Sequence, residues 1–327
     1  MGGKEPAFTF SKKALEKGIS VCSSNKELVE AYGPELIRIA AEHHCSYLFE
    51  ASVGGGIPLL HPIMECLAQE EIQSIQGILN GTTNYILTKM ERFGENYDTA
   101  LKEAQELGYA EKNPEADVEG HDTGRKIAIL ASLMTGKTVR FADETVEGIS
   151  RITPEDFACA NANGYTIKLL GMAERDNGAL SILTAPFLVP AGHPLFSVSD
   201  VFNGILIHGN MVDDLMFYGR GAGKNPTGSA VVSDMINAAK NIGKTIPVLW
   251  SSEVLKPEAS DAMCHSFFVR ADKSDREAAL KAFEGQIRAE WSNEKEFVFI
   301  TGAMPEGALA GKLSSLKAVL STIRVLA

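Results

Sequence analysis

Long apolar runs are missing from this sequence of 327 residues. No window reaches the roughly 18 consecutive apolar residues that a membrane-spanning helix needs, and the N-terminal MGGKEPAFTF has no apolar signal core. These absences argue against a membrane protein and favour a cytoplasmic location. With 45% hydrophobic residues, the chain can bury a substantial core, and we expect it to divide into two or three domains.

Paired cysteines and an excess of positive charge are absent as well. The five cysteines are odd in number, scattered and never in a CxxC pair, so neither a disulfide framework nor a zinc site is expected. The formal net charge of -11 argues against nucleic acid or an anionic membrane as a partner, because both favour clustered Lys and Arg. A small-molecule ligand fits this composition better.

The first 50 residues alternate between helical and strand-like patterns. Helical patterns over residues 6–18 and 25–44 are each followed by an apolar run, at residues 19–23 and 45–53. This alternation predicts a parallel α/β sheet. A doubly wound nucleotide-binding sheet normally opens with a strand and a glycine-rich turn, and neither precedes the first helical pattern. The sequence therefore predicts a partial, Rossmann-like nucleotide-binding domain.

The later parts of the chain predict an α+β fold. Strand-like runs at residues 165–174, 180–189 and 204–219 favour a mostly antiparallel sheet. From residue 264 onward the pattern is strand, helix, a pair of strands, helix and strand, with the helices over residues 274–285 and 306–321. This order predicts a compact βαββαβ module of its own.

Charged residues gather in GYAEKNPEADVEGHDTGRK, residues 108–126, just before the apolar run IAILASLM. One interpretation is a calcium loop, because Glu115, Asp117 and Glu119 alternate like the first ligands of an EF-hand. Pro114 and Val118 disagree with that motif, since the loop needs Gly at the turn. Another interpretation is a solvated loop followed by an ordinary helical ion pair, worth ~0.2 to 0.5 kcal/mol.

A catalytic pocket is the third interpretation, and helical geometry supports it. Asp122 and Lys126 lie one turn apart, and their row continues as Ile129, Leu130 and Leu133, so the pair should point toward the core. A lysine and a carboxylate at the edge of a core are costly unless they are paired or used. Burial lowers the pKa of a lysine side chain, which makes a half-buried lysine a candidate general acid or base.

The same charged segment resembles the substrate-binding signature of the homoserine dehydrogenases, G-Y-x-E-x-x-P-x-x-D-x-x-G-x-D-x-x-x-K. Four further segments resemble motifs of that family in the expected order: SSNKELV, EASVGGGIP, NGTTNYILTKM and GRGAGKNPTGSAVVSD. Five long motifs in order over nearly the whole chain make the probability of a chance resemblance very small, whereas one glycine cluster alone would be weak evidence.

The resemblance implies the reversible reduction of aspartate semialdehyde to homoserine by NADPH or NADH, a step toward threonine, methionine and isoleucine. In this reaction the developing alkoxide needs a proton, and the resemblance assigns that donor to Lys126. Asp122 would hold the substrate hydroxyl and the lysine, while Glu111 and Asp117 would receive the substrate ammonium group. Lys26 would lie between cofactor and substrate, although a solvated lysine is the plainer interpretation.

The resemblance also implies a place for the cofactor and for a structural monovalent cation such as Na+. Thr82 would lie beside the substrate, although Thr82 or Thr83 also fits as the cap of the following helix. The nicotinamide end would bind at Ser24, Lys26, Gly221 and Gly223. The cation would bind the Glu50 carboxylate and the carbonyl oxygens of Val53, Gly55 and Ile57. Without the resemblance, both glycine segments would be plain turns.

Two departures from the family pattern lead to further expectations. The N-terminal β-α-β unit with its G-x-G-x-x-G turn is not seen, so the pyrophosphate cradle is missing and this chain is expected to bind NADPH poorly. The tail resembles an ACT regulatory domain, but DKSDREAA stands where that family often shows D-x-P-G after the first strand. The side chains of Ser274, Asp275 and Arg276 would crowd an amino-acid ligand, so no response to threonine is expected.

The favoured interpretation is a homoserine dehydrogenase that forms a homodimer or a higher homo-oligomer. Residues 1–50 would be the remnant of the nucleotide-binding domain, rejoined by about 221–243. Residues 51–220 would form the catalytic, substrate-binding and dimerisation domain, and 260–327 the ACT-like domain. The main alternative is a catalytically inactive truncated homologue that acts as a small-molecule-binding or regulatory module. A different oxidoreductase acting on a related aldehyde would need changes in the pocket residues.

Overall fold

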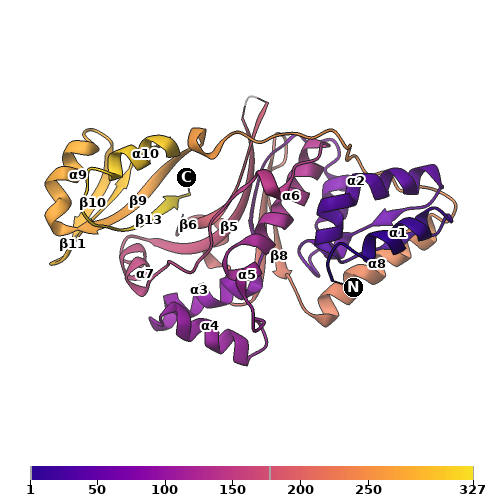
Figure 1. Cartoon of the computed structure of the whole chain (residues 1–327), viewed down its shortest axis with the longest axis horizontal. Coiled ribbons are helices and arrows are strands. Elements are labelled where there is room, and N and C mark those ends of the chain that lie inside the picture. Colours follow the sequence, from indigo (N-terminus) through magenta and orange to yellow (C-terminus); the bar gives the residue numbers. More distant parts are fainter. Residues whose placement is uncertain (1, 177, 327) are drawn as a thin grey trace.

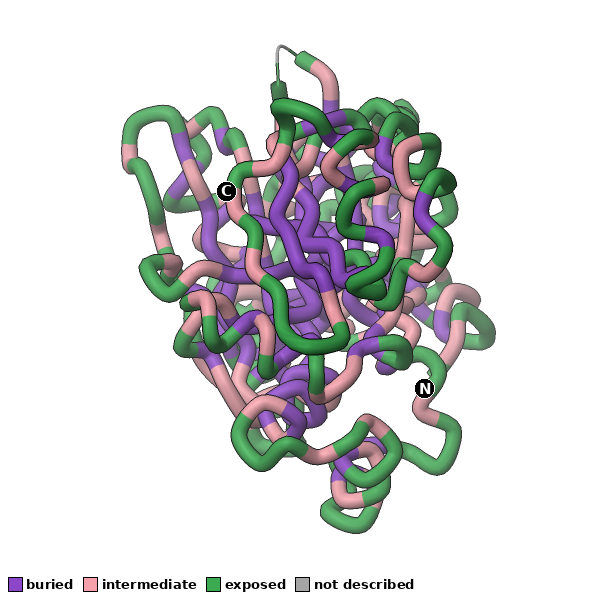
Figure 2. Tube along the Cα trace, turned by 90° about the vertical axis from the view of Figure 1, so that its left-hand side faces the viewer, coloured by how far each residue is buried: buried purple, intermediate pink, exposed green. Residues whose placement is uncertain are grey.

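The computed structural model describes residues 2–176 and 178–326, and it shows three parts side by side along the longest axis (Figure 1). The N-terminal part lies at one end, a large sheet with its covering helices lies in the middle, and the C-terminal tail lies at the other end. Buried residues concentrate in the strands and helices of the middle, whereas the connecting loops are mostly exposed (Figure 2). Among the described residues, none of the helices combines the length and the apolar character needed to span a bilayer.

The N-terminal part confirms the predicted alternation. It consists of α1 (Ala7–Leu15), β1 (Val21–Cys22), α2 (Lys26–Glu42) and β2 (Tyr47–Leu48). The two strands pair in parallel, with Val21 opposite Tyr47, as expected for strands joined by a crossover helix. Both are shorter than the apolar runs suggested. After β2 the chain turns into a 3-10 helix over Glu50–Ser52, on which the distant helix α8 (Lys224–Lys240) packs.

The middle of the molecule is built on a mostly antiparallel sheet, as predicted. The strands run in the order β10 (Ile287–Ser292), β11 (Glu296–Thr301), β9 (Cys264–Asp272), β13 (Val319–Val325), β6, β5, β3, β7, β8. The strands of the middle part are β3 (Ile72–Ile78), β4 (Thr145–Val146), β5 (Tyr165–Asp176), β6 (Ala179–Pro190), β7 (Phe202–Gly209) and β8 (Asp213–Arg220). The long hairpin of β5 and β6 forms its centre.

Both faces of the central hairpin are covered, which explains the nearly continuous apolar sequence of its strands. On one face Ile167 and Leu169 pack with helix α3 (Gly81–Phe93), and the adjoining core includes helix α6 (His121–Thr135). On the other face Leu170 and Met172 pack with the residues around the 3-10 turn Pro194–Ser197. The remaining helices are α4 (Tyr97–Glu106), α5 (Glu115–Val118) and α7 (Pro154–Asn161). Residues Pro62–Cys66 form a single π-helical turn.

The tail has the predicted βαββαβ order. It consists of β9 (Cys264–Asp272), α9 (Arg276–Ala282), β10 (Ile287–Ser292), β11 (Glu296–Thr301), the short β12 (Met304–Pro305), α10 (Glu306–Leu313) and β13 (Val319–Val325). The helix predicted over residues 306–321 is too long, because the segment from Val319 pairs with β9 as a strand. The tail has a hydrophobic core of its own, which includes Phe267, Val269 and Phe299. β13 pairs in parallel with β6, with Arg324 opposite Phe187, so the tail extends the central sheet.

A buried carboxyl group lies against the start of α6. Glu144 accepts a hydrogen bond from the Thr184 hydroxyl at 2.5 Å, and its second oxygen is buried without a hydrogen-bond partner among the described residues. Burial raises the pKa of Glu144 to about 8, although the bond from Thr184 lowers it in part. The carboxyl group is therefore largely protonated at neutral pH.

This raised pKa predicts a pH-dependent stability. Between the ordinary pKa of 4.5 and about 8, the folded state binds more protons than the unfolded state, so the Glu144 contribution to the free energy of unfolding falls as the pH rises. We expect Glu144→Gln to raise that free energy by about 1 to 3 kcal/mol at pH 8 and to change it little at pH 5. Urea unfolding at both pH values measures this. Glu284→Gln, at an exposed site, is the control, and equal curves for Glu144→Gln and the unmodified chain would contradict a protonated Glu144.

Candidate active site

Helix α3 begins at an asparagine that sequence reasoning overlooked. Asn80 has an extended backbone, and its side-chain oxygen accepts the backbone N–H of Thr83 at 2.9 Å, so it is the N-cap. The expectation that Thr82 or Thr83 caps the helix is therefore wrong. Thr82 instead donates its hydroxyl to the carbonyl oxygen of Tyr109 at 2.7 Å, which ties the start of α3 to the charged loop.

The expected pair of Asp122 and Lys126 lies in the first turns of α6. The preceding Gly120 has a φ of 82°, a left-handed conformation that favours glycine. The Lys126 ammonium group donates to Asp122 Oδ2 at 2.7 Å and to the carbonyl oxygen of Leu79 at 2.7 Å. Both side chains are buried. The prediction that this helix face points into the core is confirmed.

A second lysine, from the N-terminal part, completes an ionic cluster. Lys26 is the first residue of α2, and its Nζ lies 2.9 Å from Asp122 Oδ1. Burial by itself would raise the pKa of Asp122, but the charges of Lys126 and Lys26 outweigh it and hold that pKa well below its usual range. Burial would lower the pKa of Lys26, but the Asp122 carboxylate reverses this and raises it. Asp122 is therefore ionised between two cations.

Asn80 also joins two of the expected site carboxylates. Its amide nitrogen donates to Asp122 Oδ2 at 2.8 Å and to Asp117 Oδ1 at 2.7 Å. Burial raises the pKa of Asp117, and the bond from Asn80 lowers it in part. Asn80 thus fixes the positions of both carboxylates while capping α3. The signal that points to it in the sequence is an Asn directly before a Gly and a helical pattern, in NGTTNYIL.

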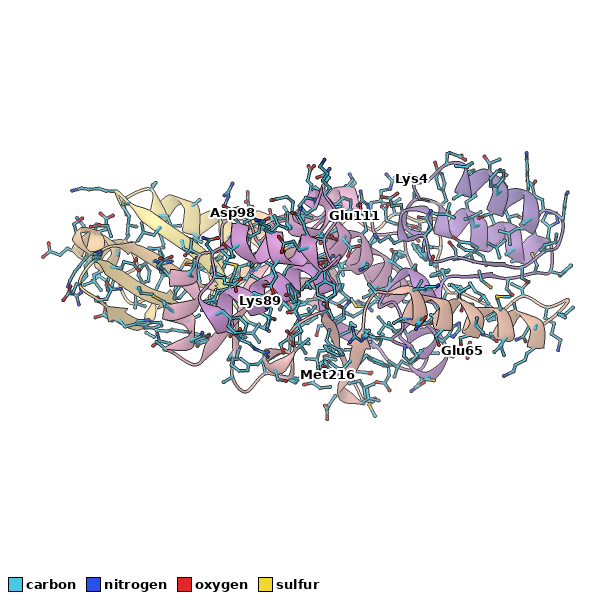
Figure 3. All side chains as sticks on the ribbon, turned by 90° about the horizontal axis from the view of Figure 1, so that it is seen from below. Lys4, Glu65, Lys89, Asp98, Glu111 and Met216 are labelled. Atoms are coloured by element: carbon cyan, nitrogen blue, oxygen red, sulfur yellow. The ribbon has the colours of Figure 1, made fainter. Side chains whose placement is uncertain are left out.

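A cavity of about 630 Å³ gathers most of the expected site residues. It lies between the start of α2, the start of α3, the charged loop and the segment before α8. Its lining includes the following residues expected from the sequence: Ser24, Lys26, Gly55, Thr82, Glu111, Asp117, Asp122, Lys126, Gly221 and Gly223. In the view of Figure 3, Glu111 lies between Asp98 of α4 and Lys4 of the N-terminal segment. Residues more than 190 positions apart in the sequence therefore line one cavity.

Two glycine turns meet at the wall of this cavity. Gly55 has a φ of 57°, and a Cβ atom there would overlap the carbonyl oxygen of Gly221. The backbone N–H of Gly56 donates to the carbonyl oxygen of Arg220 at 3.2 Å. Glycine is needed at position 55 both for its backbone conformation and for this close approach.

The Glu50 carboxylate has backbone partners that were not expected from the sequence. It lies beneath the turn and accepts the backbone N–H groups of Leu59, Leu60 and His61 at 2.5, 3.0 and 2.7 Å. These bonds use both oxygens, so the carboxylate anchors the chain after the turn. Within residues 2–176 and 178–326, no three His, Cys, Asp or Glu side chains are grouped so that they could hold a metal ion. Glu50, Val53 and Ile57 are buried behind the cavity wall.

Known proteins resemble this chain in sequence and in structure. A family model described as homoserine dehydrogenase matches residues 58–236. A homoserine dehydrogenase of Synechocystis sp. is 47% identical over 241 residues, which cover 72% of this chain and 56% of the relative. The chain thus spans little more than half the length of that curated relative.

Solved structures agree with the sequence matches. The crystal structure of a homoserine dehydrogenase from Thiobacillus denitrificans has a TM-score of 0.91 at 32% identity, and the match covers 100% of this chain and 80% of that one. A hyperthermophilic archaeal homoserine dehydrogenase in complex with NADPH has a TM-score of 0.64 at 29% identity, with 76% of this chain and 71% of that one covered. Family model, identity and superposition agree, and the chain belongs to the homoserine dehydrogenase family.

Proposed function

We propose that the cavity interconverts L-homoserine and L-aspartate 4-semialdehyde with NADP or NAD as the cofactor. The observation that supports this most is the buried Asp122 carboxylate held between Lys126 and Lys26 in a cavity that also contains Glu111 and Asp117. Hydride reduction of an aldehyde produces an alkoxide that must be protonated, and a positioned ammonium group can supply the proton. The two other carboxylates suit the ammonium group of an amino-acid substrate.

Lys126 is the proposed proton donor. Two of the three ammonium protons are directed to Asp122 and to the Leu79 carbonyl oxygen, which leaves one for a substrate oxygen in the cavity. Asp122 holds this lysine at a fixed place and accepts the substrate hydroxyl on the homoserine side of the reaction. Asn80 acts as a positioning residue for Asp122 and Asp117, and Thr82 lines the substrate space.

Ser24, Lys26, Gly221 and Gly223 would hold the nicotinamide end of the cofactor, which supplies the hydride when it is bound. They line the same cavity as Lys126, and a structural neighbour in this family is described in complex with NADPH. The glycines allow the cofactor to approach the backbone closely. Lys26 can contact cofactor and substrate together, because it lies 2.9 Å from Asp122.

We expect this 327-residue chain to bind NADPH weakly, with a dissociation constant above the low-micromolar range. The turn between β1 and α2, residues 23–25, contains no glycine, so the chain offers no glycine-rich turn there for the pyrophosphate. Titration of NADPH fluorescence measures the affinity. A low-micromolar dissociation constant would contradict this expectation, and Lys26→Ala would then show whether Lys26 contributes to the binding.

We further propose that residues 1–50 and about 221–243 form the nucleotide-binding part, 51–220 the catalytic domain and 260–327 an ACT-like domain. The first grouping is supported by Asp234 of α8, whose side chain accepts the backbone N–H of Glu50 at 3.0 Å. The last is supported by the strand order β10-β11-β9-β13. A structural Na+ at the turn after β2 would use the Glu50 carboxylate and the carbonyl oxygens of Val53, Gly55 and Ile57. A cytoplasmic location completes the proposal.

The proposed assembly is a homodimer through β8. This strand forms one edge of the sheet, and Met216 and Tyr218 are exposed on it; Figure 3 shows Met216 at the outer surface. An open apolar edge favours pairing with a second copy. Light scattering is expected to give twice the chain mass of 35.2 kDa, and Tyr218→Lys should give the monomer. Ile242→Lys, at another exposed apolar site, is the control, and a monomeric unmodified chain would contradict the proposal.

Two measurements on the same chain test the proposed activity. Calorimetry with L-homoserine reports binding to the carboxylates and lysines and does not require the cofactor. Absorbance at the nicotinamide band, with aspartate semialdehyde and either NADPH or NADH, reports turnover. Binding of homoserine without turnover would indicate a binding module, and the absence of both would exclude the proposed substrate.

A further inference from the structure

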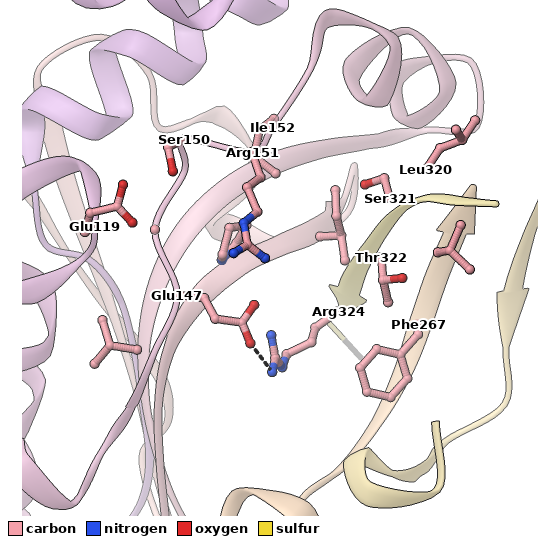
Figure 4. Close-up of a pocket in the computed structure, with 15 residues that line it drawn as sticks. Glu119, Glu147, Ser150, Arg151, Ile152, Phe267, Leu320, Ser321, Thr322 and Arg324 are labelled. Atoms are coloured by element: carbon pink, nitrogen blue, oxygen red, sulfur yellow. Dashed lines mark hydrogen bonds and ion pairs between the residues drawn. The ribbon is translucent and has the colours of Figure 1, made fainter. Parts of the chain in front are cut away.

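A second cavity, of about 550 Å³, lies where the tail joins the middle of the molecule (Figure 4). It forms because two strands leave the same edge of β6. β4 pairs with β6 at Leu183 and Thr184, and β13 pairs with it at Phe187 and Leu188. The two strands diverge around Pro186, which lines the space between them. The cavity is separate from the proposed active site.

One wall of the second cavity is a strand edge. Residues 319–323 of β13 line the cavity, and within the described chain they pair with β9 only, on the opposite edge. Alternate backbone N–H and C=O groups of an edge strand point away from its partner. This edge therefore offers hydrogen-bond donors and acceptors to a small ligand.

The charged side chains of this cavity are of both signs. Arg324 is buried and already bonded, to Glu306 at 2.6 Å and to Glu147 at 2.8 Å. Arg151, in contrast, has no ion-pair partner among the described residues, and Figure 4 shows its guanidinium group directed into the cavity. Glu119 lines another side. One unpaired cation and two carboxylates therefore lie around one space.

We propose that this cavity binds a free α-amino acid. The ligand carboxylate would bind the Arg151 guanidinium group, as Arg binds carboxylates with two parallel hydrogen bonds. Its ammonium group would bind Glu119 or Glu147, and an aliphatic side chain would pack on Phe267 and Ile152. An inorganic dianion fits less well because both carboxylates would repel it. The volume suits a small molecule.

This site differs from the turn that an ACT-type ligand would use. Residues 273–276, which follow β9, do not line the second cavity. Asp275 in that turn is buried and accepts the backbone N–H groups of Lys317 and Ala318 at 2.9 and 2.8 Å. The proposed amino acid therefore lies beyond that turn, against the outer edge of β13.

Calorimetric titration of the whole chain with each of the twenty amino acids tests the proposal. Arg151→Met is the main variant, and it should fold because Arg151 is exposed. Arg140→Met, at another exposed arginine, is the matched control. Lys26→Ala removes a cation of the first cavity, so it separates binding at the proposed active site from binding here. Glu119→Gln is a second variant of the new site.

We expect at least one amino acid to bind saturably. Arg151→Met should weaken that binding by about tenfold or more, because a hydrogen bond to a charged group is lost. Glu119→Gln should weaken it as well, while Arg140→Met and Lys26→Ala leave it unchanged. The deaminated and decarboxylated analogues of the ligand should both bind more weakly than the ligand itself.

Three results would overturn the proposal. The first is that no amino acid binds saturably. The same conclusion follows if the binding of every amino acid is lost in Lys26→Ala and kept in Arg151→Met, because all binding would then lie in the first cavity. The second is an Arg151→Met variant with unchanged affinity. The third is inorganic phosphate binding that competes with the amino acid and is stronger, which would make this an anion site. Failure of the homoserine activity test leaves this experiment unaffected.

Discussion

Replacing Lys126 with alanine is expected to lower the turnover of aspartate semialdehyde by about 10²- to 10⁴-fold, the range that general acid/base catalysis contributes. Lys126 is the cation that α6 holds between Asp122 and the Leu79 carbonyl oxygen, and alanine leaves no proton donor at that point. The fall should appear in kcat, measured from NADPH oxidation at saturating aldehyde and at an NADPH concentration raised to saturation, because the chain is expected to bind NADPH weakly. Near-normal turnover would show that another group protonates the alkoxide.

A lysine in the same charged loop provides the matched control. Lys112 is exposed, so Lys112→Ala removes the same charge from the neighbourhood without touching the cluster. Its turnover should remain within about twofold of the unmodified chain, because an exposed charge is screened by water and salt. The melting temperature of Lys126→Ala should also be recorded, since Asp122 keeps Lys26 as a partner and the fold should survive.

The second large effect is expected at Asp122, and it concerns stability as well as binding. Asp122→Ala leaves Lys126 buried beside a carbonyl oxygen and without its carboxylate. Removing one partner of a buried ion pair typically costs about 3 to 5 kcal/mol. We expect a loss of this size in the free energy of unfolding from urea denaturation, together with the loss of homoserine binding. A variant with unchanged stability would mean that the cluster is open to water.

Asn80→Ala is the control for Asp122→Ala because it removes one hydrogen bond to the Asp122 carboxylate and one to the Asp117 carboxylate without removing a charge. Asn80→Ala should lower the free energy of unfolding by less, about 1 to 3 kcal/mol, since a helix cap and two hydrogen bonds are lost but no buried charge loses its partner.

The pH dependence of stability also distinguishes the loss of the Asp122 charge from the loss of Asn80. The folded pKa of Asp122 lies well below the ordinary 3.8, so its stabilisation is present above pH 3.8 and is lost as the pH falls further. Asp122→Asn lacks that acid-side loss.

The helical part of the site followed from the sequence, because a spacing of four residues puts Asp122 and Lys126 on one helix face. The rest depended on contacts between distant segments. Asn80 meets the carboxylates of Asp117 and Asp122 only where the chain after β3 reaches α5 and the start of α6, and a cap residue gives no hint of such partners. The Glu50 carboxylate is a second case, because the chain folds back and brings three backbone N–H groups onto it.

The element boundaries failed for a similar reason. Residues 314–318 continue a helical pattern, and the sequence predicted one long helix through residue 321. The helix stops at Leu313 because the following chain gains a row of hydrogen bonds to β9. Such a pairing joins residues about fifty positions apart, and tertiary contacts of this kind override local propensity.

The position of β13 between β9 and β6 determines how the tail unfolds. The last strand of the chain is paired on one edge within the tail and on the other with the central hairpin, and Phe268, Val298 and Ile323 of the tail share a core with α3. The tail cannot melt independently without breaking this backbone ladder and opening that core. The slowest amide hydrogens of the tail should therefore exchange with solvent at the same rate as the slowest ones of β5 and β6, because all of them belong to one cooperative unit.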